Sequence, residues 1–393
     1  MIKKLNICLI YPGFPPEDDI GGGISIYCNM LVDSLVSLGI YPTVITRSNN
    51  LVPKINSYKG AKIYRVPAGN FNSLTLKLVV DFSNELTDLV NKLEASHGKF
   101  DVIEMVDWGG EAISFLPEYK DRLIIRCHTP GFIAQSFNPS NEPYLNNEIL
   151  ELEQNVLLNA KYIVTSSKLL MAKIEDFLNQ KLKYTLSPIM GIGDQTYAKK
   201  KYKKYFNSKV PMRVICCGRI EERKGFGLLV NVVDELIDIG YNIRLDIYGN
   251  STPLIRNEKS SDKLQKIIKH KDNIKILGEI KHNLLLKMYK KYDLCVVPSH
   301  FESWSLVGIE AISSGLPTLL SKGVELAHRL SYSKNKLIFE INKNDDLKAK
   351  SQYIYDNYLD IRKVFVRDYN QIVRILSPNK VAYEILKYYQ SIK

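Results

Sequence analysis

Short apolar runs alternate along the chain with longer segments in which apolar residues recur every three or four positions. Apolar runs of strand length indicate strands covered on both faces of a sheet, and the longer periodicity indicates amphipathic helices. Such alternation predicts right-handed β-α-β crossovers in parallel sheets. The expected strands are 5–10, 43–46, 62–66, 101–106, 123–127, 162–165, 213–217, 244–248, 274–277, 294–298 and 317–321, and the expected helices include 24–38, 74–93 and 146–159.

The distribution of charge divides this alternating pattern into two parts. Residues 1–155 contain 13 Lys and Arg against 18 Asp and Glu, whereas the rest of the chain contains 41 against 24. A basic run at 199–204 lies between the two parts. The sequence therefore predicts an α/β protein of two doubly wound domains, residues 1–190 and 210–376, joined by a linker at 191–209.

Composition excludes several classes of protein. The chain has 393 residues, and none of its apolar runs approaches the roughly 18 residues of a membrane span. Its first apolar run ends at Pro12-Gly13 without a small-residue cleavage site, so we interpret it as a strand and expect a cytoplasmic protein. Six cysteines form no C-x-x-C pair and lie mostly in apolar runs, which predicts buried, reduced thiols rather than a zinc site or disulfides.

The formal net charge of +12 suggests an anionic ligand, which could be RNA, a membrane surface or a phosphorylated small molecule. An RNA-binding protein is one alternative, motivated by the basic run at 199–204. The sequence shows no aromatic platform interleaved with basic residues, as single-strand RNA recognition requires. A phosphorylated small molecule is therefore the favoured ligand class.

Parallel sheets bind ligands at the carboxyl ends of their strands, so residues that directly follow strands are the candidates for chemistry. Gly22 and Gly23 precede the first expected helix, where backbone amides can approach an anion closely. A turn without a chemical role is the alternative. After the strand at 213–217, Arg219 and Lys224 could bracket a diphosphate, or they could form ion pairs in a solvated loop.

The segment 298–317 has the most specific pattern. Glu302 follows a strand, and a helix expected from about Ser303 carries Glu310 before a glycine and a proline end it. Along a helix, eight residues span on the order of 10 Å, which suits a nucleotide sugar held at both ends. A glycosidase with these two carboxylates is the alternative, but it would have no use for the basic pair after the 213–217 strand.

These segments, taken in order with the closing stretch 377–388, resemble the retaining glycosyltransferases of the GT-B architecture, family 4, also called group 1. The resemblance extends over essentially the whole chain. It implies two Rossmann-like domains facing across a cleft, with the last helix, 377–393, crossing back onto the N-terminal domain. It also implies that the C-terminal domain binds most of a nucleotide-diphosphate sugar.

The resemblance assigns roles to individual positions. Arg219 and Lys224 resemble the pair that holds the donor diphosphate, Glu302 resembles the acid that contacts the transferred hexose, and Glu310 resembles the acid that binds the ribose hydroxyls. The further donor-binding positions that it implies are Gly22, Gly23, Gly249, Leu277, Gly278, Ser305, Leu306 and Val307. The family often has Phe-Gly where this chain has Trp304-Ser305.

His128 follows the strand at 123–127. A histidine in this place is by itself more often a capping or core residue, but the resemblance implies that it contacts the donor hexose and has a catalytic role. Asp107 and Trp108 follow the preceding strand and are expected to meet the acceptor. Glu104 lies within that strand and is interpreted as structural.

The implied activity is transfer of a hexose from a UDP- or GDP-sugar to an acceptor hydroxyl, with retention at the anomeric carbon. The acceptor is expected to be a glycan, a lipid-linked molecule or another hydroxyl compound in polysaccharide, glycolipid or glycoconjugate biosynthesis. No metal, other cofactor or nucleic acid is expected, and peripheral contact with the inner face of the membrane stays open. A nucleotide-sugar epimerase or a phosphorylase on the same architecture is the main alternative.

Overall fold

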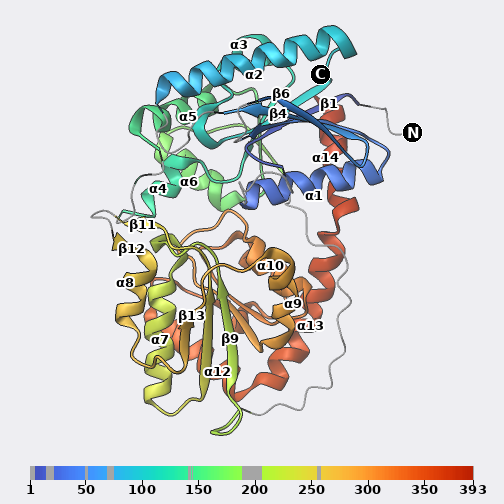
Figure 1. Cartoon of the computed structure of the whole chain (residues 1–393). Coiled ribbons are helices and arrows are strands. Elements are labelled where there is room, and N and C mark those ends of the chain that lie inside the picture. Colours follow the sequence, from blue (N-terminus) through green and yellow to red (C-terminus); the bar gives the residue numbers. More distant parts are fainter. Residues whose placement is uncertain are drawn as a thin grey trace. The chain divides into compact units, whose positions relative to one another are not determined.

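The computed structural model describes residues 5–14, 22–48, 52–68, 75–139, 143, 145–187, 206–254 and 258–392. The chain forms two compact units, which Figure 1 shows coloured along the sequence. The first unit comprises Met1–Ala134, Pro143–Met190 and Leu376–Lys393, and the second comprises Gln135–Glu142 and Gly191–Ile375. Of the expected linker, residues 191–205, with the basic run, lie outside the described residues.

The first unit is built on an eight-stranded sheet of order β3-β4-β2-β1-β5-β6-β7-β8. All neighbouring strands are parallel except β3 and β4, which are antiparallel. The strands are β1 Ile7–Tyr11, β2 Thr43–Ser48, β3 Lys54–Tyr58, β4 Ala61–Pro67, β5 Val102–Val106, β6 Leu123–Cys127, β7 Tyr162–Thr165 and β8 Tyr184–Leu186. Every residue of β1, β5 and β6 is buried, as expected for strands covered on both faces.

Helices cover both faces of this sheet, with α2 on one face and α1 on the other (Figure 1). They are α1 Gly23–Ser37, α2 Leu76–His97, α3 Leu116–Tyr119, α4 Gly131–Ser136, α5 Asn147–Asn159, α6 Lys168–Leu178 and α14 Pro378–Ser391. Side-chain caps begin three of them, because Thr75, Asn146 and Ser167 accept hydrogen bonds from amides three residues on.

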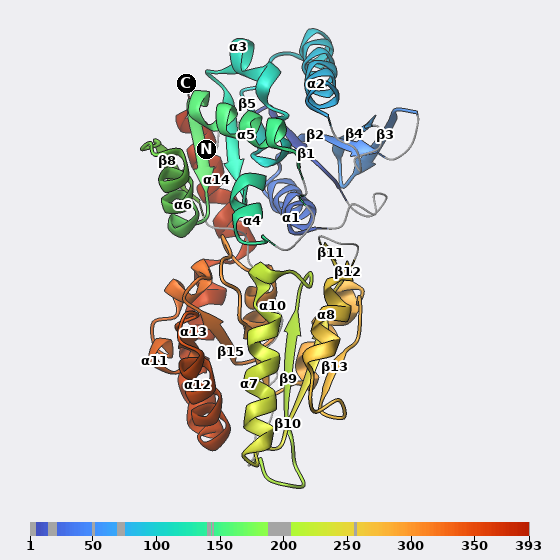
Figure 2. The same cartoon turned by 90° about the vertical axis from the view of Figure 1, so that its left-hand side faces the viewer.

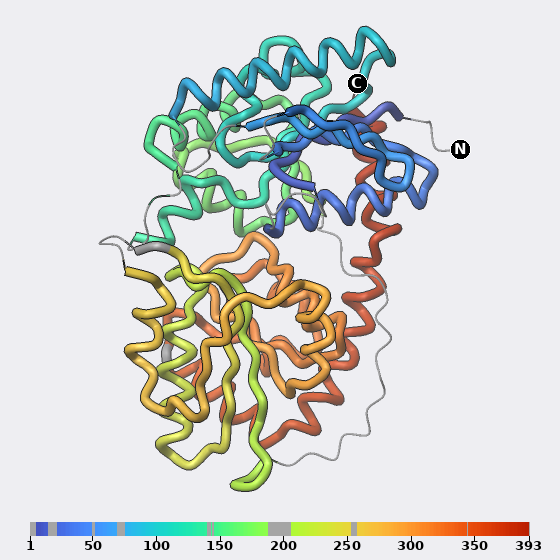
Figure 3. The backbone as a smooth tube through the Cα atoms, viewed as in Figure 1, coloured from blue at the N-terminus to red at the C-terminus, as the bar shows by residue number. Residues whose placement is uncertain are grey.

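The last helix, α14, packs against α1, and the two can be followed side by side in Figures 1 and 3. Its Tyr389 hydroxyl donates to Glu104 Oε2 at 2.7 Å, and Tyr11 donates to Glu104 Oε1 at 2.5 Å. Arg126 binds both oxygens of the same carboxylate at 2.8 Å each. A buried ion pair is tolerated when further hydrogen bonds satisfy it, so Glu104 joins the C-terminal helix to the core of the first unit.

The second unit contains a six-stranded parallel sheet of order β13-β10-β9-β14-β15-β16 and a short antiparallel hairpin, β11-β12. Its strands are β9 Met212–Cys217, β10 Ile243–Tyr248, β11 Pro253–Leu254, β12 Glu258–Lys259, β13 Ile274–Ile276, β14 Leu294–Val297, β15 Thr318–Ser321 and β16 Ile338–Phe339.

Helices also cover both faces of the second sheet, with α7 and α8 on one side and α9 and α10 on the other (Figures 1 and 2). The helices are α7 Phe226–Asp238, α8 Ser260–Ile267, α9 His282–Met288, α10 Leu306–Ser313, α11 Lys334–Leu337, α12 Asn344–Asp356 and α13 Tyr358–Ile375. The change of face between α8 and α9 follows from the strand order, because the connections run outward from β9 on one side and then return to β14 on the other.

The expected α/β fold with two Rossmann-like parallel sheets is confirmed. The six cysteines are buried and free. One local expectation is wrong: the helix expected from about Ser303 begins at Leu306. Strand β3, at 54–58, was not among the expected strands. Among the described helices, none combines the length and apolarity needed to cross a membrane.

Candidate active site

The loops that follow β9, β10 and β14 come very close together at the carboxyl edge of the second sheet. A Cβ on Gly249 would lie 1.7 Å from the carbonyl oxygen of Gly218, and one on Gly225 would lie 2.0 Å from that of Pro298. Gly225 also has a φ of 68°. Only glycine fits at these two positions, so they hold the loops that carry the candidate residues against one another.

Lys224 and Glu302 meet at this edge, with 2.9 Å between Nζ and Oε1. Ser299 donates to the same carboxylate oxygen at 2.5 Å. Burial alone would raise the pKa of Glu302, but the Lys224 ammonium and these hydrogen bonds hold it below its usual value. Burial lowers the pKa of Lys224, and Glu302 partly opposes that effect. The structure thus brings together a cation and an acid that lie 78 positions apart in sequence.

A second buried ion pair supports the turn that carries Lys224. Arg223 pairs with Glu221 at 2.5 Å and donates to the carbonyl oxygen of Phe301 at 2.9 Å. Its own amide donates to Asn138 Oδ1 at 2.9 Å. No pattern in the sequence pointed to these residues. The neighbouring Arg219 follows β9 and is exposed, so its side chain is accessible to a ligand.

Glu310 lies within α10 and is buried. His282 Nε2 lies 2.8 Å from its Oε1, and the Tyr289 hydroxyl donates to its Oε2 at 3.4 Å. The hydrogen bond to Glu310 raises the pKa of His282. Because Glu302 precedes the helix, the expected spacing of about 10 Å along one helical axis does not apply to the two acids. His282 and Tyr289 were missed because they come from another segment, α9 and the 3-10 turn Tyr289–Lys291 that follows it.

The start of α10 differs from the expectation. Its first residues are Leu306 and Val307, so the amides of Ser303 and Trp304 are not part of the helix. Ser305 caps the helix by accepting from Gly308 N at 3.1 Å, and it does so with a φ of 94°. Ser305 therefore adopts a backbone conformation that favours glycine. This agrees with the expected difference at Trp304-Ser305, where the family that the sequence resembles often has Phe-Gly.

Gly249, Leu277 and Gly278 follow β10 and β13 at the same edge. Gly249 N donates to Gly278 O at 2.8 Å, and Leu277 is exposed. All expected site residues of the second unit thus lie at the carboxyl end of its sheet. The structure joins Lys224 to Glu302 directly, whereas Glu310 binds partners of its own.

In the first unit, His128 directly follows β6. Its amide donates to Asp107 Oδ2 at 3.1 Å, and its ring packs edge-on against Tyr27 and Tyr11, with centroids 5.0 and 6.3 Å away. Burial, with a smaller effect of the Arg126 charge, lowers the pKa of His128 to about 3. The imidazole is therefore neutral at physiological pH.

Two buried acids beside the segments after β5 and β6, Asp107 and Glu153, accept hydrogen bonds from backbone amides. Burial raises the pKa of Asp107 to about 7. Glu153 of α5 accepts from Gly109 N at 2.7 Å, and burial raises its pKa to about 8. Trp108 begins the short 3-10 turn Trp108–Gly110. Sequence reasoning missed Glu153, although it lies on the otherwise apolar face of α5 with Ile149, Leu150, Val156 and Leu157.

Gly22 and Gly23 lie at the start of α1, Gly22 as its N-cap and Gly23 as its first residue. A Cβ on Gly22 would meet no atom within 4 Å, so packing does not demand a glycine there. Within the described ranges, no group of three or more His, Cys, Asp and Glu side chains could hold a metal ion.

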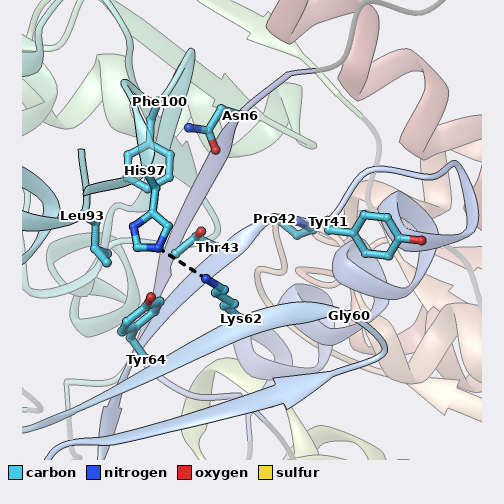
Figure 4. A pocket seen from close by; sticks show the side chains of 10 residues that line it. All are labelled: Asn6, Tyr41, Pro42, Thr43, Gly60, Lys62, Tyr64, Leu93, His97 and Phe100. Atoms are coloured by element: carbon cyan, nitrogen blue, oxygen red, sulfur yellow. Dashed lines mark hydrogen bonds between the residues drawn. The ribbon is translucent and has the colours of Figure 1, made fainter. Parts of the chain in front are cut away.

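A cavity in the first unit lies at the opposite edge of its sheet, where β1, β2 and β4 begin (Figure 4). Lys62 Nζ and His97 Nε2 face each other across part of it at 3.4 Å. Its lining residues are Asn6, Tyr41, Pro42, Thr43, Gly60, Lys62, Tyr64, Leu93, His97 and Phe100. None of the expected site residues lines this cavity.

Comparison with known proteins finds a family match within the second unit. The profile of the family described as glycosyl transferases group 1 matches residues 198–368, which include Lys224, Glu302 and Glu310. The matches support a GT-B glycosyltransferase.

Curated relatives are similar over most of the chain. An uncharacterized glycosyltransferase of Methanocaldococcus jannaschii is 23% identical over 355 residues, which cover 87% of this chain and 86% of the relative. A D-inositol 3-phosphate glycosyltransferase of Geodermatophilus obscurus is 25% identical over 319 residues, which cover 76% of this chain and 70% of the relative.

Solved structures share the fold. Sucrose-phosphate synthase from Thermosynechococcus elongatus superposes with a TM-score of 0.76 at 19% identity, covering 99% of each chain. An α,α-trehalose-phosphate synthase from Burkholderia xenovorans has a TM-score of 0.70 at 12% identity, covering 98% of this chain and 100% of that one. At these identities the similarity concerns the fold alone.

Proposed function

We propose that this chain is a retaining, family 4 glycosyltransferase that transfers a hexose from a UDP- or GDP-sugar to an acceptor hydroxyl, without a metal ion. The observation that carries the proposal is the buried Lys224–Glu302 pair at the carboxyl edge of the second sheet, within the region that matches glycosyl transferases group 1. The contacts of each candidate residue support a distinct role in this reaction.

Lys224 and Arg219 would bind the donor diphosphate. An ammonium has three N–H donors, and the bond to Glu302 uses one of them. Arg219 adds an exposed guanidinium on the same loop. As the bond between the anomeric carbon and the phosphate oxygen breaks, negative charge develops on the leaving diphosphate, and cations placed there in advance lower the barrier.

Glu302 and Glu310 would bind the two sugars of the donor. An ionised carboxylate accepts up to about four hydrogen bonds. Glu302 keeps its charge because Lys224 holds its pKa low, so it can accept from hexose hydroxyls. Glu310 is oriented by His282 and Tyr289, which leaves further acceptor capacity for the vicinal hydroxyls of a ribose.

His128 and Asp107 would act on the hexose and the acceptor. Since His128 is neutral at physiological pH, it would orient the hexose by hydrogen bonding rather than donate a proton as an acid. In a retaining transfer on one face, the acceptor oxygen bonds to the anomeric carbon while its proton passes to the departing phosphate oxygen. That pathway needs no protein nucleophile.

A thermal-shift panel of nucleoside diphosphates and their sugars tests the donor, because a ligand that binds the native state raises its stability. Acceptors in the activity assay should include D-inositol 3-phosphate, for which one relative is named, together with glycan and lipid-linked hydroxyls. Proton NMR of the product then reports retention or inversion at the anomeric carbon.

Arg219→Ala tests the diphosphate role most directly, because the side chain is exposed and its removal should leave the fold intact. We expect a loss of about 10²- to 10³-fold in turnover, by analogy with removal of an oxyanion-hole donor. Arg244→Ala is the matched control, since Arg244 is also exposed but lies near the beginning of β10. Equal turnover of the two variants would reject the diphosphate role.

A further inference from the structure

Glu153 stands out among the buried charged groups of the first unit. It lies in the middle of α5 and is fully buried, and it is held by backbone amides rather than by a cation. Both carboxylate oxygens instead accept from backbone amides: Oε1 from Gly109 at 2.7 Å and Oε2 from Phe132 at 3.2 Å. A buried carboxylate is costly, so its retention at this position calls for an explanation beyond packing.

The two amides belong to segments that follow different strands, the turn after β5 and the start of α4 after β6. Gly109 lies in the turn after β5, two residues after Asp107, and Phe132 lies after β6, four residues after His128. Glu153 therefore links the two loops that carry the candidate residues of this unit. The loops meet again where the amide of His128 donates to Asp107.

The space around the carboxylate is closely packed. A Cβ on Gly131 would lie 3.1 Å from both oxygens of Glu153, and one on Gly110 would lie 2.8 Å from the Leu152 side chain. Gly109 and Gly110 have φ values of 76° and 69°. The turn after β5 thus reaches the carboxylate through two glycines with positive φ, and the start of α4 approaches it closely at Gly131.

We propose that Glu153 is a positioning residue for the transfer reaction: it holds the Asp107–Trp108 turn and the His128 loop in register through hydrogen bonds to their backbones. The expected effect on activity rests on the proposed function, whereas the effect of Glu153 on the position of the two backbones does not. Burial and the neighbouring Asp107 raise the pKa of Glu153, which agrees with a carboxyl held for its geometry rather than for its charge.

Glu153→Gln tests this role. The side chain keeps its size, but an amide offers one acceptor oxygen in place of two, and its NH₂ group faces one of the backbone donors. We expect kcat for transfer to fall by about 10- to 100-fold, the effect of displacing a reacting group by on the order of 1 Å. The affinity for a nucleoside diphosphate should stay within about twofold of wild type, because Glu153 lies in the first unit and the proposed diphosphate site, with Lys224, lies in the second.

Glu151→Gln is the matched control, since Glu151 is an exposed acid on the same helix. Glu153→Asp is the second variant: its carboxylate is one methylene shorter and should reach at most one loop. It should therefore show the same loss in kcat with an unchanged nucleotide affinity.

NMR of histidine ring resonances supplies a readout that does not depend on activity. The chain has six histidines, and loss of one resonance in His128→Asn assigns that of His128. The resonance should move in both Glu153 variants and stay in place in Glu151→Gln. If it moves while the wild type uses none of the nucleotide sugars, the proposed function fails but the positioning role stands.

A His128 resonance and a kcat that both match wild type in Glu153→Gln would overturn the inference. Loss of folding in both Glu153 variants, with Glu151→Gln folded, would also overturn it, because the carboxylate would then serve the stability of the unit rather than the placement of its loops.

Discussion

Buried acids at the carboxyl edges of the two sheets have different partners, and their pKa values are shifted in opposite directions. In the second unit, Glu302 is paired with Lys224, and its pKa lies below the usual value. In the first unit, Asp107 and Glu153 accept from backbone amides, and burial raises their pKa values to about 7 and about 8. Burial is nearly complete in all three cases, so the difference comes from the partner: a cation offsets the loss of hydration, whereas amide dipoles offset only part of it.

This difference suits the proposed reaction. A diphosphate is anionic at all relevant pH values and calls for cations fixed by permanent ion pairs. A neutral sugar and an acceptor hydroxyl call for oriented hydrogen-bonding groups without strong charge, which neutral His128 and its neighbours supply. The following predictions test the contrast, from the largest expected effect to the smallest.

Removing the cation should make Glu302 resemble Asp107 and Glu153 of the first unit. Lys224→Met leaves a buried carboxylate without its partner, and we expect a loss of about 3 to 5 kcal/mol in the free energy of unfolding. Turnover should fall by about 10²- to 10³-fold. Urea denaturation and steady-state kinetics measure the two effects.

Two further variants control this result. Lys322→Met removes an exposed ion pair with Glu340 and should change stability by less than about 1 kcal/mol. The double variant Lys224→Met/Glu302→Gln should regain most of the lost stability but no activity. A stable Lys224→Met single variant would show that the pair is not the source of the contrast.

The acids of the first unit should make stability depend on pH. The pKa of Glu153 is raised to about 8 in the native state, from 4.5. Between these values the unfolded chain releases the proton and the native chain retains it, so stability falls as pH rises, by up to about 1.4 kcal/mol per pH unit. Above the native pKa this contribution becomes constant.

Glu153→Gln should therefore show a shallower fall in unfolding free energy than wild type between pH 6.5 and 8. The depressed pKa of His128 makes stability rise with pH, but only between about pH 3 and pH 6.5. It therefore does not contribute between pH 6.5 and 8. Urea denaturation at a series of pH values measures both slopes. Parallel curves would mean that Glu153 is ionised in the native state, as Glu302 is.

The helix caps of the two units allow a finer comparison. Ser305 caps α10 with a φ of 94°, whereas Ser167 caps α6 with a φ of −132° and accepts from Leu170 N at 2.9 Å. Replacing either cap by Ala should cost about 1 kcal/mol. The Gly variant should be more stable than the Ala variant at both positions. The difference should be about 1 kcal/mol larger at Ser305 than at Ser167, because Gly also relieves the strained backbone there. Thermal denaturation of the four variants measures these differences. An equal difference between the Gly and Ala variants at the two positions would exclude strain at Ser305.

The smallest effect concerns the protonation of His128. With a pKa of about 3, its ring should show no titration between pH 5 and 8, whereas the pKa of His282 is raised by Glu310 and its ring should titrate above the usual range. Histidine-selective NMR across this range measures both. A His128 titration near pH 6.5 would show that its surroundings are more hydrated than the packing against Tyr11 and Tyr27 indicates.

Much of the candidate site could be predicted because its residues follow strands. The apolar runs located β6 and β7 to the residue, and the carboxyl-edge rule then selected His128, Lys224 and Glu302. The start of α10 was misplaced because Ser303 and Ser305 are both good helix caps, and only the close packing of the loop after β14 selects the second. Glu153 carried a detectable signal, an acid on an apolar helical face, which was not used.

The sequence by itself determined the doubly wound α/β fold of the two units, most of their strands and the edge at which the site residues lie. These features depend on local periodicity and on the handedness of crossovers, which act over a few tens of residues. Only the tertiary structure decided the partners of those residues: Lys224 for Glu302, His282 and Tyr289 for Glu310, and two loop amides for Glu153. Such partners come from distant segments, and the balance of burial and charge that sets each pKa exists only when they meet.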